Sequence, residues 1–137
     1  MKNRIFISIF IFFLSFNVYA CRCIEPSHSK AFELSEVIVI GEVLEISSLA
    51  GVEGSIAIIN VNKAWKKQIK SKIGILSITN CNFTMNKGKH YILFLKSEEY
   101  GLYSTGRCSG NKLVSDSDSE KLVKWLGTKK NYAIDNK

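Results

Sequence analysis

Cys21-Arg22-Cys23-Ile24-Glu25-Pro26 is the stretch from which the fold of this chain can be worked out. It follows residues 1–20, which have a positively charged start, an apolar run and, at Val18-Tyr19-Ala20, a small-residue cleavage site, as secretory signal peptides do. Cleavage there makes Cys21 the first residue of the exported protein. A chain terminus normally frays. Two cysteines at the start of a domain can instead be fixed to its body by disulfides, which would hold the terminal α-amine in a defined place.

Val18-Tyr19-Ala20-Cys21 also admits a rival interpretation, in which a lipid is attached at Cys21 and blocks both its amine and its thiol. Tyr19 is large for such a motif, and lipidation would leave an odd number of cysteines. The apolar run of the signal is short for a membrane span, and we expect no span elsewhere in the chain. The predicted location is therefore outside the cytosol, either secreted or periplasmic.

All four cysteines follow the predicted signal: Cys21, Cys23, Cys81 and Cys108. An even number of cysteines in a small exported domain predicts two disulfides. A bridge between Cys21 and Cys23 is sterically poor, so each pairs with one of the two distant cysteines, in either of two ways. Each long loop closed in this way is worth about 4 kcal/mol in the chain-entropy model. The chain has no C-x-x-C spacing, and His28 and His90 are isolated, so we expect no metal or cofactor of its own.

Apolar periodicity and turn residues predict five strands with a helix on either side. We expect helices over residues 27–35 and from the capping-box pattern Ser117-Asp118-Ser119-Glu120 to Gly127, and strands over residues 36–47, 55–66, 73–79, 90–96 and 100–105. The fold class is mainly β: an antiparallel five-stranded barrel with short flanking helices, because few other arrangements hide the edges of so small a sheet. One domain covers residues 21–127, and the basic tail 128–137 is expected to be loose.

Two details of the predicted strands bear on the core. Gly41 interrupts an apolar run, as glycine does at a bulge or a barrel corner. Alternation places Ala57, Ile59, Val61 and Trp65 on one face of their strand. We expect both tryptophans, Trp65 and Trp125, to lie in the core.

The opening of the predicted domain resembles that of the tissue inhibitors of metalloproteinases, and is similar to the wider netrin-like module. The resemblance is carried by Cys21–Pro26, by Ala31-Phe32, by residues 35–41 and by Val61-Asn62-Lys63-Ala64-Trp65-Lys66. It implies an OB-like five-stranded barrel with flanking helices. It also implies the pairing of the cysteines, as Cys21–Cys81 and Cys23–Cys108.

The sequence departs from the family at three positions near the terminus. Glu33 stands where the inhibitors have a third cysteine, Arg22 where a small Thr or Ser is usual, and Glu25 where Pro is common. We expect the protein to lack the second, C-terminal subdomain of the animal inhibitors. The framework therefore matches the family better than the contact residues do.

The family resemblance implies an inhibitor of zinc metalloproteinases. The α-amine and carbonyl oxygen of Cys21 would chelate the zinc of the target enzyme and displace its bound water. The amine must be neutral to bind metal, which costs little because a terminal amine has a pKa near ~8. The residues implied to contact the protease are Arg22, Cys23, Ile24, Thr79, Asn80 and Cys81.

Arg22 would point into the specificity pocket beside the target zinc. A buried, unpaired guanidinium would cost several kcal/mol. The sequence therefore predicts a target with an acidic or open pocket, or weak inhibition of enzymes whose pocket is apolar.

A second interpretation is a netrin-like module that binds a protein or a polyanion without inhibiting any protease. The chain carries a formal net charge of +7, and its candidate polyanion patch consists of Lys63, Lys66, Lys67, Lys70 and Lys72. We do not expect nucleic acid as a partner, because the protein is exported and shows no aromatic stacking platform. Enzyme motifs of the common hydrolase, P-loop and dinucleotide types are absent, so we expect no enzymatic activity. We also expect the protein to be a monomer.

Overall fold

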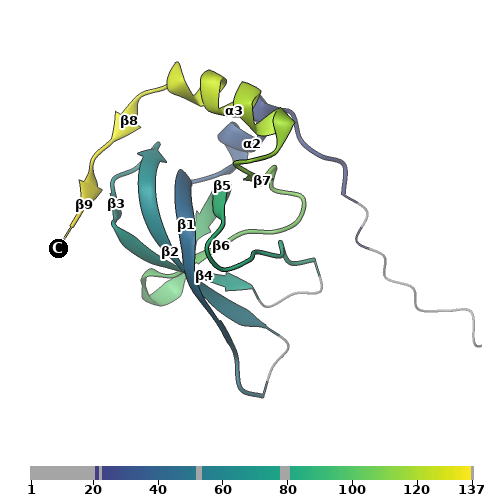
Figure 1. The fold of residues 1–137 in the computed structure, drawn as a ribbon, viewed down its shortest axis with the longest axis vertical. Helices are drawn as coiled ribbons and strands as arrows, with labels where there is room; N and C mark the ends of the chain where they lie inside the picture. The colour runs from purple at the N-terminus through teal and green to yellow at the C-terminus, as the bar shows by residue number, and fades with distance from the viewer. Residues whose placement is uncertain (1–20, 22, 52–53, 78–80, 137) are drawn as a thin grey trace, which may run out of the picture.

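A computed structural model describes residues 21, 23–51, 54–77 and 81–136 (Figure 1). Its main feature is a closed five-stranded barrel in which β1 bonds to β2, then β4, β6 and β5 follow, and β5 bonds back to β1. The β4–β6 pairing is parallel and the other four are antiparallel. The barrel strands are β1 (Val37–Ser48), β2 (Ser55–Trp65), β4 (Lys72–Ser77), β5 (His90–Ser97) and β6 (Tyr103–Ser104). The predicted OB-like five-stranded barrel is thereby confirmed, with the parallel β4–β6 pairing as its one departure from the predicted antiparallel arrangement.

Two helices flank the barrel, and Figure 1 shows both at the same end of it. They are α2 (His28–Leu34), whose N-terminus is capped by the Ser27 hydroxyl, and α3 (Ser117–Gly127). The remaining elements are short: β3 (Ile69–Lys70), the 3-10 turn η1 (Glu99–Gly101), β7 (Lys112–Leu113), β8 (Asn131–Tyr132) and β9 (Ile134–Asp135). None of the helices in the described part of the chain is long and apolar enough to cross a bilayer.

The buried side chains form two clusters. One fills the barrel and includes Val39, Ile59 and Leu93, which are fully buried. The other lies between the outer wall of the barrel and the helices, where Trp65 packs with Leu122 and Leu126 among others. Burial of large apolar side chains supplies about 1.5–3 kcal/mol each. The second cluster therefore fixes the helices, and with them the segment that precedes α2, to the barrel.

A bulge in β2 decides which side chains enter each cluster. Ile40 lies opposite Lys63 and Gly41 lies opposite Val61, so Asn62 is the extra residue. After the bulge the alternation changes phase, so Trp65 faces the helices rather than the barrel interior. The prediction that Trp65 is buried is confirmed, but the prediction that it shares a face with Ala57 is wrong.

Gly41 lies at this bulge, as the sequence predicts. A Cβ there would lie 2.6 Å from the carbonyl oxygen of Asn60 and 2.5 Å from Cγ2 of Ile59. The two strand backbones approach so closely that only glycine fits.

Four sequence predictions about the second half of the chain are corrected. The predicted fifth strand is reduced to β6, because Tyr100 adopts a left-handed conformation with φ 58°. The capping box of α3 does not form: Asp116 is the N-cap residue, without a side-chain cap bond, and the Ser119 hydroxyl donates to carbonyls upstream.

The predicted loose tail instead contributes β8, which pairs with the end of β2, and β9, which pairs with β3 in the connection between β2 and β4. Trp125 is only partly buried and packs edge-on against Phe32, with ring centroids 5.5 Å apart. The tail is ordered because the chain after α3 runs back along the barrel (Figure 1).

Candidate functional site

Two disulfides attach the N-terminal segment to the barrel. Cys21 is bonded to Cys81 and Cys23 to Cys108, with Cα atoms 5.8 Å and 5.1 Å apart. This is the pairing that the family resemblance implies. Successive cysteines, two residues apart, are thus bonded to two different parts of the chain. The bridges also indicate an oxidising compartment outside the cytosol.

The two receiving segments are themselves joined through their backbones. The amide of Arg107 donates to the carbonyl oxygen of Cys81 over 2.9 Å, and Asn82 forms an antiparallel bridge with Gly106. The partners of Cys21 and Cys23 therefore belong to one hydrogen-bonded unit. The two bridges therefore attach the terminal segment to one unit of the structure and not to two independent loops.

Asn111 fixes this unit to the barrel. Its Oδ1 accepts from the amide of Phe94 over 2.8 Å, and its Nδ2 donates to the carbonyl oxygen of Gly106 over 3.0 Å. Thr105 completes the network: its hydroxyl lies 2.9 Å from the same Nδ2 and donates to the Phe94 carbonyl oxygen over 2.7 Å. Asn111 is buried; its bond with the Phe94 amide is shielded from water, and the other bonds of the network are partly buried.

Sequence reasoning missed Asn111. The residue follows Gly110, whose φ is +92°, and such a Gly-Asn pair is typical of any surface turn. Nothing in the local pattern distinguishes an asparagine that is buried as a hydrogen-bonding centre from one that is exposed in a turn.

An ion pair fixes the terminal segment at the point where it leads toward α2. Glu25 forms an ion pair with Lys112 of β7, whose side chain is mostly buried. Between this pair and the disulfides lies Ile24, which is 93% exposed. The departure from the family at Glu25 thus has a structural role. A large apolar side chain next to the terminus is left fully available for contact with a partner.

The structure describes only part of the residues that the resemblance implies for protease contact. Cys21, Cys23 and Cys81 are brought together through the bridges, with Ile24 beside them. Arg22, Thr79 and Asn80 lie outside the described residues. Within the described residues, no group of three or more His, Cys, Asp or Glu side chains could hold a metal ion.

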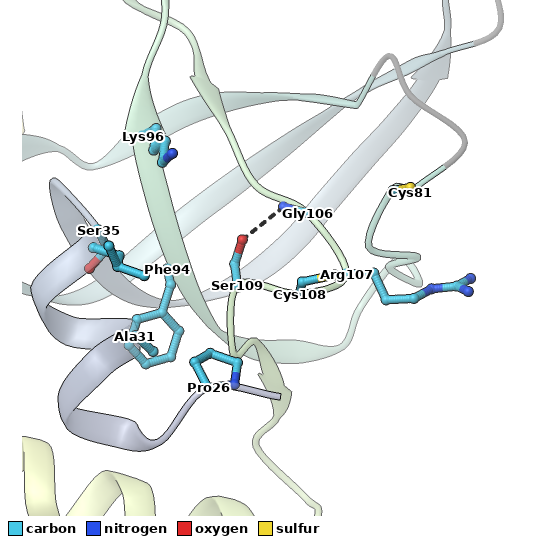
Figure 2. A pocket seen from close by; sticks show the side chains of 11 residues that line it. Pro26, Ala31, Ser35, Cys81, Phe94, Lys96, Gly106, Arg107, Cys108 and Ser109 are labelled. Carbon is cyan, nitrogen blue, oxygen red and sulfur yellow. Dashed lines mark hydrogen bonds between the residues drawn. The ribbon is translucent and has the colours of Figure 1, made fainter. Parts of the chain in front are cut away.

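A cavity of about 290 Å³ lies directly beside the terminal segment (Figure 2). It is enclosed on one side by residues of α2 and on the other by the disulfide-bearing segments. Its lining residues are Pro26, Ala31, Leu34, Ser35, Cys81, Phe94, Lys96, Gly106, Arg107, Cys108 and Ser109.

The candidate polyanion patch is smaller than the sequence suggests. The ammonium of Lys66 points to the C-terminal end of α2, where it donates to the backbone carbonyls of Phe32, Glu33 and Ser35. It also lies 5.2 Å from the centre of the Phe32 ring. Lys66 thus acts as a cap for the helix. The other four lysines, Lys63, Lys67, Lys70 and Lys72, are exposed.

One carboxyl beside this region has a shifted pKa. The adjacent Ser97 hydroxyl lowers the pKa of Glu36, and the Ser97 backbone, Lys67 and Lys96 act in the same direction. The ionised form of Glu36 is therefore favoured in the folded protein.

No family model and no curated protein matches this sequence. The resemblance to the metalloproteinase inhibitors therefore stays a prediction.

Proposed function

We propose that the protein, exported and cleaved before Cys21, inhibits a zinc metalloproteinase through its N-terminus. The α-amine and carbonyl oxygen of Cys21 would form a five-membered chelate on the target's zinc and displace its activated water. The observation that carries the proposal is the double attachment of Cys21 and Cys23 to one hydrogen-bonded unit.

Rigidity is what such a mechanism requires. A free chain end would lose backbone freedom on entering an active site, at a cost of roughly 1–2 kcal/mol per residue. Here the disulfides, the Glu25–Lys112 ion pair and the Asn111 network hold the segment before any partner arrives. Preorganisation of this kind raises affinity by reducing the entropy lost on binding.

The first test is inhibition of a panel of zinc endopeptidases by protein whose free Cys21 amine has been confirmed by intact mass and N-terminal sequencing. We expect that adding one alanine before Cys21 weakens inhibition at least about tenfold, because the amine no longer reaches the zinc. A matched control adds one alanine after Lys137, at the other end of the chain. Equal inhibition by all three proteins, or none by the free form across the panel, would contradict the proposal.

Ile24 offers a second, independent test. Because its side chain is 93% exposed, Ile24→Ser should leave the unfolding midpoint unchanged. A contact residue beside the terminus should nevertheless weaken inhibition when it is made polar, by roughly five- to thirtyfold if it contributes about 1–2 kcal/mol. The exposed residue Tyr100, in η1, provides the control variant Tyr100→Ser. An unchanged inhibition constant for Ile24→Ser would exclude Ile24 from the interface.

A further inference from the structure

We infer that the cavity beside the terminal segment is a binding site for a small amphipathic carboxylate, with an aliphatic tail inside and its anionic head at Lys96. The cavity shares Cys81 with the residues implied to contact the protease, but the inference does not depend on the proposed function. It rests on the chemistry, size and polarity of the cavity.

The apolar part of the cavity is formed by α2, β5 and the residue that leads into α2. Pro26, Ala31, Leu34 and Phe94 contribute hydrocarbon surface. Leu34 is 58% exposed, so part of its side chain is in contact with water in the free protein. An aliphatic chain lying against these residues would remove apolar surface from water on both sides, at about 25 cal/mol per Å².

The charged part is cationic. Lys96 and Arg107 line the cavity, and no acidic residue is found among the described residues that line it. Figure 2 shows the Arg107 side chain pointing away from the other labelled residues, whereas Lys96 lies at the opposite end of the group from Pro26. Lys96 forms no ion pair within the described part of the chain. Lys96 also lowers the pKa of the Glu36 carboxyl, which is not among the residues that line the cavity, so an anion bound at Lys96 would share this ammonium with Glu36. The cavity is polarised from a cationic end to an apolar end.

The volume limits the length of the ligand. At roughly 30 Å³ for each water-sized group, a cavity of about 290 Å³ holds on the order of ten non-hydrogen atoms. That number matches an eight-carbon carboxylate. It is small for the 300–1,000 Å³ pockets that take drug-sized ligands, so we expect binding in the millimolar range.

The probe for the test is octanoate, with octanamide as the neutral compound of equal length. Both are titrated into the isotope-labelled, disulfide-bonded protein while backbone amide resonances are recorded. We expect octanoate to shift the amides of Ser35, Lys96, Gly106 and Ser109, and octanamide to bind more weakly. Affinity should rise from hexanoate to octanoate and then level off at decanoate, because the cavity is full.

Lys96→Met tests the head-group contact, since it removes the ammonium and retains an apolar stem. We expect octanoate binding to weaken by roughly two- to fivefold, as for other exposed charge pairs, with octanamide unaffected. Lys87→Met, in the exposed turn before β5, makes the same change of charge and should have no effect on either. Leu34→Ala should weaken both compounds, because both use the tail site.

Three results would overturn the assignment. They are equal affinity for octanoate and octanamide, equal losses in Lys96→Met and Lys87→Met, and shifts that do not map to the cavity. A short peptide with a free C-terminal leucine serves as a further arm, and tighter binding of that peptide than of octanoate would overturn the choice of a fatty chain. None of these measurements involves a protease, so the inference and the proposed function can fail separately.

Discussion

The ammonium of Lys66 lies 2.7 Å from the backbone carbonyl oxygen of Phe32, at the C-terminal end of α2. A lysine that directly follows the last residue of β2 thus satisfies carbonyls that a seven-residue helix leaves without intrahelical partners. The contact links the barrel to the helix that begins only five residues after Cys23. Its importance can be measured.

Lys66→Met should destabilise the protein by about 1 kcal/mol, because the helix carbonyls lose a charged donor while the apolar stem is kept. The matched control is Lys63→Met, three residues earlier on β2, where the side chain is exposed. Denaturant unfolding of both variants gives the difference. Equal unfolding midpoints for the two variants would show that water can replace the Lys66 ammonium at the helix carbonyls without loss of stability.

Asn111→Ala should cost roughly 2–3 kcal/mol, since the buried amide of Phe94 and the partly buried carbonyl of Gly106 both lose their partner. If the proposed function is right, inhibition should fall as well at temperatures where the variant is fully folded, because the disulfide-bearing loop is less firmly held. Asn86→Ala, in an exposed turn, is the comparison. A variant with wild-type stability would mean that the network is not needed.

Gly41→Ala should destabilise the barrel by about 1–3 kcal/mol, because the added methyl meets the Asn60 carbonyl oxygen and β1 must move away from β2. Gly127→Ala is the control, since a Cβ there meets nothing within 4 Å. Thermal unfolding distinguishes the two. Equal melting temperatures for the two variants would show that the bulge accommodates the added methyl group without loss of stability.

Glu36 gives a prediction about pH. Its pKa is lowered in the folded state from an ordinary value of 4.5, so its contribution to stability is present above that value and is lost as the pH falls through the lower, folded pKa. Glu36→Gln should therefore reduce stability slightly at neutral pH and converge with the wild type in acid. Because the side chain is exposed, the part of the difference that comes from Lys67 and Lys96 should shrink in high salt. A constant difference across the acidic range would contradict the assignment.

The sequence was sufficient for the barrel because the information lies in local patterns. Alternating apolar residues define β2 and an apolar run defines β5, and the closure of a five-stranded sheet then follows from its exposed edges. The sequence was insufficient where one extra residue changes the alternation of inward and outward side chains along a strand. The extra residue Asn62 turns Trp65 to the opposite face, and alternation alone carries no sign of it.

The candidate site was predictable only where covalent chemistry marks it. Cysteine spacing and family resemblance led to the terminal segment and to the pairing of its bridges. Asn111, Lys66 and the Glu25–Lys112 ion pair act through contacts between residues far apart in sequence. Their residue types are common on surfaces, so only the three-dimensional arrangement reveals that they support the terminus.

The disulfide between Cys23 and Cys108 spans 85 residues of sequence. Cys23, one of the first residues of the domain to be synthesised, can form its bridge only after Cys108, in the loop after β6, has been made. Chains shortened before Cys108, or kept in a reducing environment, would present a loose end in place of a fixed one. An activity that depends on the position of Cys21 would therefore appear only after the chain has been synthesised as far as Cys108, folded and oxidised.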